Sequence, residues 1–378
     1  MGKSMMKRTI LAKKESTYGT DAAPTGSNAI LVRNMSVQML NAETVGRDLI
    51  RPYYGNSDVL IAQSNALAEF EVELAGAGTP GIAPAWGELI EACSFSKTLN
   101  TGSVSITRSG AVATVTKTAH GYAIGDSIKI SGATETEYNG TFTVATVPTA
   151  DTFTYAVTGT PSTPATGTPV IGTNAVYTPI SSTCPSITIY FSLDGIRQKI
   201  TGARGTFEMS LNVKQIPVLK FTFTGIYNAP TDTADPSPDF TGFKAPKIAN
   251  TTNTPTFSLF SYSGYLESMI LSLNADIQYR TLIGYQEVAF VDRKPSGNFV
   301  VEMPTLAAKD FFALAIAGTT GALSLTHGIV TGNKVSIAAP VVSLQNPTIQ
   351  ESQNIAMLSL PFVPTPSSGN DEFTITCA

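Results

Sequence analysis

Runs in which apolar and polar residues alternate recur along most of the chain and predict β-strands. In residues 69–74 (EFEVEL) three acidic positions alternate with apolar ones, and residues 206–214 alternate in the same way. Such alternation is typical of an antiparallel sheet that buries one face. Further long strands are expected at 30–40, 186–192, 198–201 and 218–227.

Helical spacing is confined to two short segments. Trp86, Leu89, Ile90 and Cys93 fall on one face of a helix expected over 84–95. A stripe of this kind indicates core packing, with the single Trp as its anchor. A second helix is expected over 307–318.

Composition agrees with a mainly β protein. Only 14% of the 378 residues are charged, and there are 31 Gly and 23 Pro. Low charge with many turn formers and β-branched residues favours strands joined by turns. The formal charge of −4 argues against a chain that binds nucleic acid over its whole surface.

The amino-acid composition and the strand pattern change between residues 98 and 176. Both flanks are rich in Thr, Gly, Ser and Pro, and short alternating strands lie between them at 111–115, 127–130, 141–147 and 152–157. We expect a small β domain inserted through two flexible linkers. A further linker is expected at 228–256, which contains five prolines.

Few residues could carry chemistry. Three widely spaced Cys and two isolated His predict neither a disulfide framework nor a metal site, so no cofactor or metal is expected. The basic N-terminus lacks the apolar stretch of a secretion signal, and no apolar run is long enough to span a membrane. We therefore expect synthesis and assembly in a cytoplasm, without membrane insertion.

One motif suggests a dinucleotide site, namely Gly76, Gly78 and Gly81 in a GxGxxG pattern between a strand and a helix. The preceding strand alternates instead of being continuously apolar, as a buried parallel strand would be. Pro80 and Pro84 also remove amide donors from the turn, and no acidic residue follows at the spacing that holds a ribose. An enzyme that rests on this motif is the weakest alternative, and we predict no enzymatic activity.

An internal repeat is the most informative feature. Residues 40–50 (LNAETVGRDLI) and 273–283 (LNADIQYRTLI) match without a gap at six of eleven positions. Strand, helix and late strands follow each segment in the same order. We predict a unit that occurs twice, with the first copy in residues 1–97 and 177–245, the insert in 98–176 and the second copy in 246–378.

The repeated unit resembles the tail tube protein family of long-tailed bacteriophages. The resemblance extends to the opening segment RTILAKKESTYGTDAAPTGSNAILVRNMSV and to the acidic strand followed by PAWGELIEACSF. The insert is similar to a small immunoglobulin-like β module that recurs in phage structural proteins. The resemblance implies tandem β-sandwich or barrel units, each with one flanking helix.

The family resemblance also implies a function. Its members form rings that stack into a tube with a β-barrel inner wall of about twenty-four strands, wide enough for duplex DNA. The duplication favours a ring of three chains. The implied partners are the chain itself, the tape-measure, tail-terminator and distal tail proteins, and double-stranded DNA in transient passage within the virion. An insert that projects outward favours a non-contractile tail.

Two groups of residues are candidate sites. A lumen that does not hold DNA needs a neutral or acidic lining, which predicts a lumen-facing role for Glu69, Glu71, Glu73 and Glu302 or for the face from Glu208 to Lys214. The long loops expected at 41–67 and 274–297 are candidates for contact with the adjacent ring, through Arg47, Arg51, Tyr53, Tyr54 and Arg280. A baseplate or host-recognition protein, or a surface adhesin, stays open as an alternative.

Overall fold

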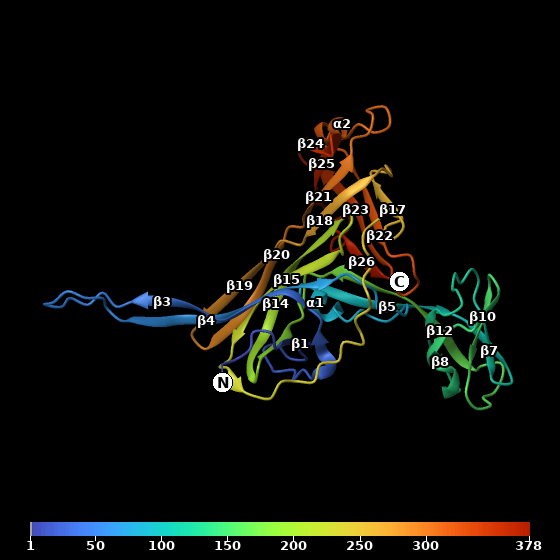
Figure 1. Ribbon diagram of the computed structural model, residues 1–378, viewed down its shortest axis with the longest axis horizontal. Coiled ribbons are helices and arrows are strands. Elements are labelled where there is room, and N and C mark those ends of the chain that lie inside the picture. Colours follow the sequence, from blue (N-terminus) through green and yellow to red (C-terminus); the bar gives the residue numbers. More distant parts are fainter. Residues whose placement is uncertain (1) are drawn as a thin grey trace.

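The structure is a computed structural model, which describes residues 2–378, and it consists mainly of β-strands (Figure 1). The helix expected over 84–95 is shortened to α1 (Gly87–Glu91), and the one expected over 307–318 to α2 (Phe311–Ile316). Asp310 caps α2 by accepting a hydrogen bond from the Ala313 amide. The mainly β fold is confirmed.

One band of eight antiparallel strands runs through both halves of the chain. Its order is β3 (Arg33–Gly46), β4 (Val59–Glu73), β15 (Val218–Tyr227), β14 (Ile196–Asn212), β18 (Leu266–Ser272), β21 (Ser296–Glu302), β25 (Ile355–Pro364) and β24 (Thr348–Ser352). The first four strands come from the predicted first copy and the last four from the second. The two halves meet where Met209 of β14 pairs with Leu271 of β18.

A second layer of strands covers the apolar face of this band. It contains β5 (Phe95–Ser103), β12 (Gly167–Pro179), β26 (Thr374–Cys377), β23 (Val335–Leu344), β22 (Thr320–His327) and β17 (Thr256–Leu259), paired in that order. The C-terminal strand β26 therefore lies between strands of the two halves. One hydrophobic cluster, from Ile10 to Cys377, fills the space between the layers.

The N-terminal segment is anchored to the body of the molecule by strand pairing. β1 (Arg8–Lys14) pairs with β13 (Ile187–Leu193), and β2 (Ala29–Ile30) pairs with β1. β13 continues into β14, and the short β16 (Thr231–Asp232) lies beside the start of β14. Ile10 and Ala12 are buried in the main core, which accounts for the anchoring.

The inserted β domain has its own core, but its flanks differ from the expected flexible linkers. A sheet of β6 (Ser105–Ser109), β7 (Val112–Thr116), β11 (Thr152–Ala156) and β10 (Thr146–Thr149) packs with β8 (Ser127–Ala133) and β9 (Gly140–Thr143). Strands β5 and β12 form both flanks and pair with each other from Phe95 to Ser103. β12 then pairs with β8, so a continuous ribbon leads into the insert.

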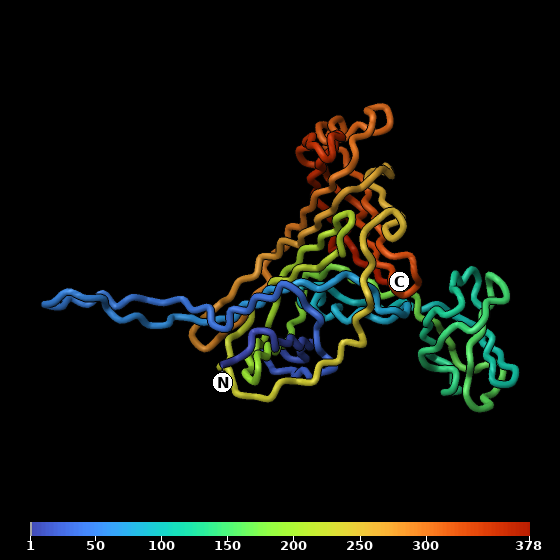
Figure 2. The backbone as a smooth tube through the Cα atoms, viewed as in Figure 1, coloured from blue at the N-terminus to red at the C-terminus, as the bar shows by residue number. Residues whose placement is uncertain are grey.

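The segments expected to be long loops are β-hairpins. β3 and β4 extend past the body as a long arm, at the opposite end of the molecule from the insert (Figures 1 and 2). β19 (Ala275–Leu282) and β20 (Tyr285–Arg293) form the second hairpin. The first hairpin could not be predicted because its outer strands do not alternate clearly between apolar and polar residues, whereas residues 275–280 of the second (ADIQYR) do alternate and could have indicated a strand.

The two hairpins agree in register. A shift in pairing falls between Glu43 and Thr44 in the first, and between Asp276 and Ile277 in the second, at matching positions of the eleven-residue repeat. Near each tip an arginine faces an acidic residue of the other strand. Arg280 lies opposite Glu287 in the second hairpin, and Arg47 donates a hydrogen bond to Asp58 in the first. The first tip is four residues longer.

The GxGxxG segment is a packing joint between three parts of the chain. The Gly76 amide donates to Asn333 Oδ1 over 2.6 Å, and the Gly78 amide donates to the Gly332 carbonyl over 2.8 Å. A Cβ on Gly81, which has a left-handed φ of +74°, would overlap the backbone of Gly172 at the root of the insert. These glycines serve close backbone approach, and the motif needs no ligand to explain it.

Candidate assembly and lumen surfaces

An acidic patch lies on the face of the eight-stranded band that points away from the core. Phe70 and Val72 are buried, so Glu69, Glu71 and Glu73 point to the opposite face. Across the strands, Lys220 of β15 lies between Glu71 and Glu208 of β14. Both faces proposed from the sequence are therefore parts of one surface.

Two cations bind the carboxylates of this patch. Lys220 Nζ lies 2.8 Å from Glu69 Oε1, and this hydrogen bond is the main cause of the raised pKa of Lys220. Arg33 Nε lies 3.2 Å from Glu71 Oε2. We define the acidic patch as Glu69, Glu71, Glu73, Glu208, Lys220 and Arg33; four carboxylates against two cations give it a formal charge of −2.

Glu302 lies on the same face but in the second half of the band. Its neighbours Phe299 and Val301 are buried in the core, so Glu302 points outward as Glu69 does. Strands β15, β14 and β18 separate β21 from β4. The structure thus brings the four predicted carboxylates to one face without placing Glu302 beside the other three.

The band ends in two open edges. Within residues 2–378, β3 pairs only with β4, and β24 pairs only with β25. Ile349 of β24 is 61% exposed although it sits on a strand of a large sheet. An open, partly apolar strand edge favours pairing with another chain.

The tip of the long arm carries the four predicted contact residues of the first hairpin. Arg47 Nη1 bonds Asp58 Oδ2 over 2.9 Å, and Arg51 lies 3.6 Å from the same carboxylate. The Arg51 guanidinium lies 6.0 Å from the centre of the Tyr53 ring, and Tyr54 is fully exposed. The fifth predicted residue, Arg280, is also exposed but lies at the tip of the other hairpin, so the five do not form one site.

The second hairpin rests on the first half of the chain, through Arg204 of β14. Arg204 Nη1 lies 3.1 Å from Glu287 Oε1 and donates to the Val288 carbonyl over 2.7 Å. Nη2 donates to the Cys184 carbonyl, and the guanidinium stacks 4.6 Å from the Tyr18 ring centre. Burial raises the pKa of Tyr18 to about 12, so its hydroxyl stays neutral and accepts a hydrogen bond from the Val288 amide.

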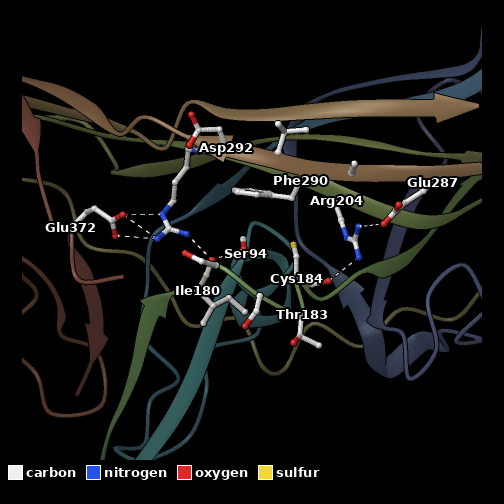
Figure 3. A pocket seen from close by; sticks show the side chains of 14 residues that line it. Ser94, Ile180, Thr183, Cys184, Arg204, Glu287, Phe290, Asp292 and Glu372 are labelled. Carbon is white, nitrogen blue, oxygen red and sulfur yellow. Dashed lines mark hydrogen bonds and ion pairs between the residues drawn. The ribbon is translucent and has the colours of Figure 1, made fainter. Parts of the chain in front are cut away.

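Arg293 fixes the other end of this hairpin. Its Nη2 lies 3.0 Å from Glu372 Oε1, and its Nη1 donates to the Ile180 carbonyl over 2.6 Å. A cleft of about 430 Å³ is lined by both arginines and by residues of β20, including Glu287 and Phe290 (Figure 3). Since both guanidinium groups are paired with carboxylates, the cleft has no free cation among its lining residues to hold an anionic ligand.

Sequence reasoning missed this contact. Tyr18, Arg204, Arg293 and Glu372 are far apart in the chain, and none belongs to a recognisable motif. The only local signal is the sequence Gly202-Ala203-Arg204-Gly205, in which an arginine interrupts a buried strand. Within residues 2–378, no cluster of His, Cys, Asp or Glu suits a metal ion, and no helix is long and apolar enough to cross a membrane.

The family model of the phage tail tube protein matches residues 7–364, nearly the whole chain. The chain therefore belongs to the phage tail tube protein family, and it is a structural protein of the phage tail. This family is structural and not enzymatic.

No curated protein matches the sequence. Among solved structures, the chain is similar to the phage phi92 endosialidase, with 8% sequence identity and a TM-score of 0.21. The alignment covers 82% of this chain and 54% of that one, so the chain spans about half the length of that protein.

Proposed function

We propose that three copies of this chain close into a ring with pseudo-sixfold symmetry, and that these rings stack into the tail tube. The supporting observation is the eight-stranded band, which takes four strands from each half and is open at both edges. The matching hairpins support an origin by duplication of one tube unit. Three bands give the twenty-four strands that the family resemblance implies.

The junction inside the chain is a template for the junction between chains. In the chain, β14 at the end of the first half pairs with β18 at the start of the second, with Met209 opposite Leu271. Met209 pairs with β15 and Ile349 pairs with β25 in the same register. The two residues therefore occupy equivalent positions in the first and second halves of the band. We therefore assign the ring seam to β24 of one chain and β3 of the next, with Ile349 opposite Val37.

The acidic face of the band lines the lumen in this proposal. Closing the band with its core outside leaves Glu69, Glu71, Glu73 and Glu302 directed at the channel. A lining of this charge does not gain affinity for DNA by counterion release, so DNA passes without being held. The insert then projects outward at the end of the β5–β12 ribbon, which supports a non-contractile tail.

The remaining contacts lie along the tube axis. The tip residues Arg47, Arg51, Tyr53 and Tyr54, and Arg280 at the second tip, contact the adjacent ring in this proposal, because aromatic residues and arginine are enriched in interfaces. The tape-measure, tail-terminator and distal tail proteins meet the tube interior and its two ends. Assembly takes place in the host cytoplasm.

The seam is tested by Ile349→Asp, which places a charge on the proposed β24–β3 contact. The expected product is a folded chain that no longer forms tubes in negative-stain electron microscopy. Ile124→Asp is the matched control, because Ile124 is an exposed isoleucine of the insert, and this variant should assemble normally. If Ile349→Asp forms normal tubes, β24 is not part of the seam.

A further inference from the structure

The two hairpins differ in how well they are covered. Val288 of β20 and Val59 of β4 occupy matching positions, each one residue after the acidic residue that faces the tip arginine. Val288 is fully buried, whereas Val59 is 61% exposed. The neighbours of Val59 on the arm, Val45, Leu60 and Ile61, are also more than half exposed. An exposed apolar strand pair of this length indicates a surface that a partner covers.

The partner of the second hairpin is known, because it belongs to the same chain. Val288 is covered by the first half, where Arg204 binds its carbonyl and Tyr18 binds its amide. This contact follows from the strand order: β18 pairs with β14, so the hairpin that continues from β18 must pass beside Arg204 of β14. The hairpin position is thus a consequence of the junction between the halves.

The equivalent of Arg204 in the second half can be assigned from the sheet register. Phe221 of β15 and Leu360 of β25 lie opposite the matching residues Phe70 and Phe299. Thr224 and Val363 each follow three residues later on these strands. Thr224 lies opposite Arg204, and Val363 lies opposite Ser343. Ser343 therefore occupies the place of Arg204, at the end of β23 where the chain turns towards β24.

We infer that the arm of each chain lies along the second half of the neighbouring chain in the same ring, with Val59 at the neighbour's Ser343. The inference rests on the proposed ring, in which β3 pairs with β24 of the next chain. Because the arm continues from β3 and β4, that pairing directs its base past the end of β23. The partner that covers the apolar arm is a second copy of this chain, and only the tip from Arg47 onward is left to reach the adjacent ring.

Cross-linking of assembled tubes tests this arrangement. The variant carries Val59→Cys and Ser343→Cys, both conservative changes, and is treated with a short bismaleimide. The single-cysteine variants are the controls for reaction at the native cysteines, of which Cys93 and Cys377 are buried. A contact within a closed ring joins the chains around that ring, so the products on a denaturing gel should end at the trimer.

Other products have distinct meanings. A series that ends at the hexamer keeps the lateral arm contact but overturns the ring of three chains. Cross-linked products larger than the hexamer would mean that the arm links successive rings. Absence of cross-linking in intact tubes would mean that Val59 does not contact Ser343. Either result overturns the inference. If the double variant does not assemble, hydrogen exchange on wild-type tubes decides: residues 43–46 and 59–63 should exchange at least tenfold more slowly than in unassembled chains, and equal rates would refute the arm contact.

Discussion

Reversing the charge of the acidic patch should turn a tube that does not hold DNA into one that does. We consider Glu69→Lys, Glu71→Lys and Glu73→Lys together. With Lys220 and Arg33 retained, five cations then face the single carboxylate of Glu208, so the formal charge of the patch changes from −2 to +4. Alternate residues on a strand are about 7 Å apart, close to the rise along the helix axis between every second phosphate of one DNA strand.

The magnitude follows from counterion release. Three phosphates neutralised by each chain contribute about −2.7 to the slope of log K against log salt, so the affinity of a tube for duplex should fall at least about 40-fold between about 50 and 200 mM salt. Retention of a short fluorescent duplex by sedimented tubes measures this slope. Wild-type tubes and a triple Glu→Gln variant should retain little duplex at either salt concentration.

A control must separate the lumen from the outer surface. Thr107→Lys, Thr141→Lys and Thr143→Lys add three lysines at exposed positions of the insert, which is outside the tube in the proposal. These lysines should bind duplex weakly, and the bound duplex should be removed by nuclease, whereas duplex in the lumen of the patch variant should be protected. Equal nuclease sensitivity in the two variants would refute the assignment of the acidic face to the lumen.

Three further changes test the packing on which the assembly surfaces depend. Arg293→Met leaves Glu372 without its ion-pair partner in a site where both side chains are nearly buried. Chemical unfolding of the unassembled chain, followed by Trp86 fluorescence, should show that the free energy of unfolding falls by about 3–5 kcal/mol. A fall of less than about 1 kcal/mol would contradict the role given to this pair. Gly81→Ala should lower stability by about 1–3 kcal/mol, because its Cβ overlaps the Gly172 backbone, and should speed proteolysis between the insert and the body; Gly110→Ala, also at a left-handed φ but with open space around it, is the control and should not affect this proteolysis. Burial raises the pKa of Asp21, but hydrogen bonds from Lys199 and Tyr190 outweigh burial and hold this pKa below its usual range. The stability that Asp21 contributes is therefore present above the usual Asp pKa of about 4 and is lost as pH falls through the lowered pKa. Asp21→Asn should flatten the acid side of the profile of stability against pH, and an unchanged acid side would refute this coupling.

Much of the β architecture could be predicted from the sequence. Residues 69–74 and 206–214 alternate strictly because each strand has one face in the core, and both lie in the structure as expected. The eleven-residue repeat also has a structural reason. Asn41 donates to Asn65 across the first hairpin, and Asn274 donates to Ser296 across the root of the second.

The parts that could not be predicted depend on contacts far apart in the sequence. The arm strands are exposed on both faces, so they lack the apolar alternation that marks a half-buried strand. The flanks of the insert are rich in Thr and Gly, yet Leu99 and Ala175 pair in a continuous ribbon. Arg204 could not be singled out, because its partners Glu287 and Cys184 are brought to it only by the fold.

The most direct test of the account is the rotational symmetry of the tube. Electron cryomicroscopy of tubes assembled from the purified wild-type chain should show three copies per ring, an inner wall of twenty-four strands, and β24 of each chain paired with β3 of the next. Six copies per ring, or a wall in which these two edges remain unpaired, would contradict it.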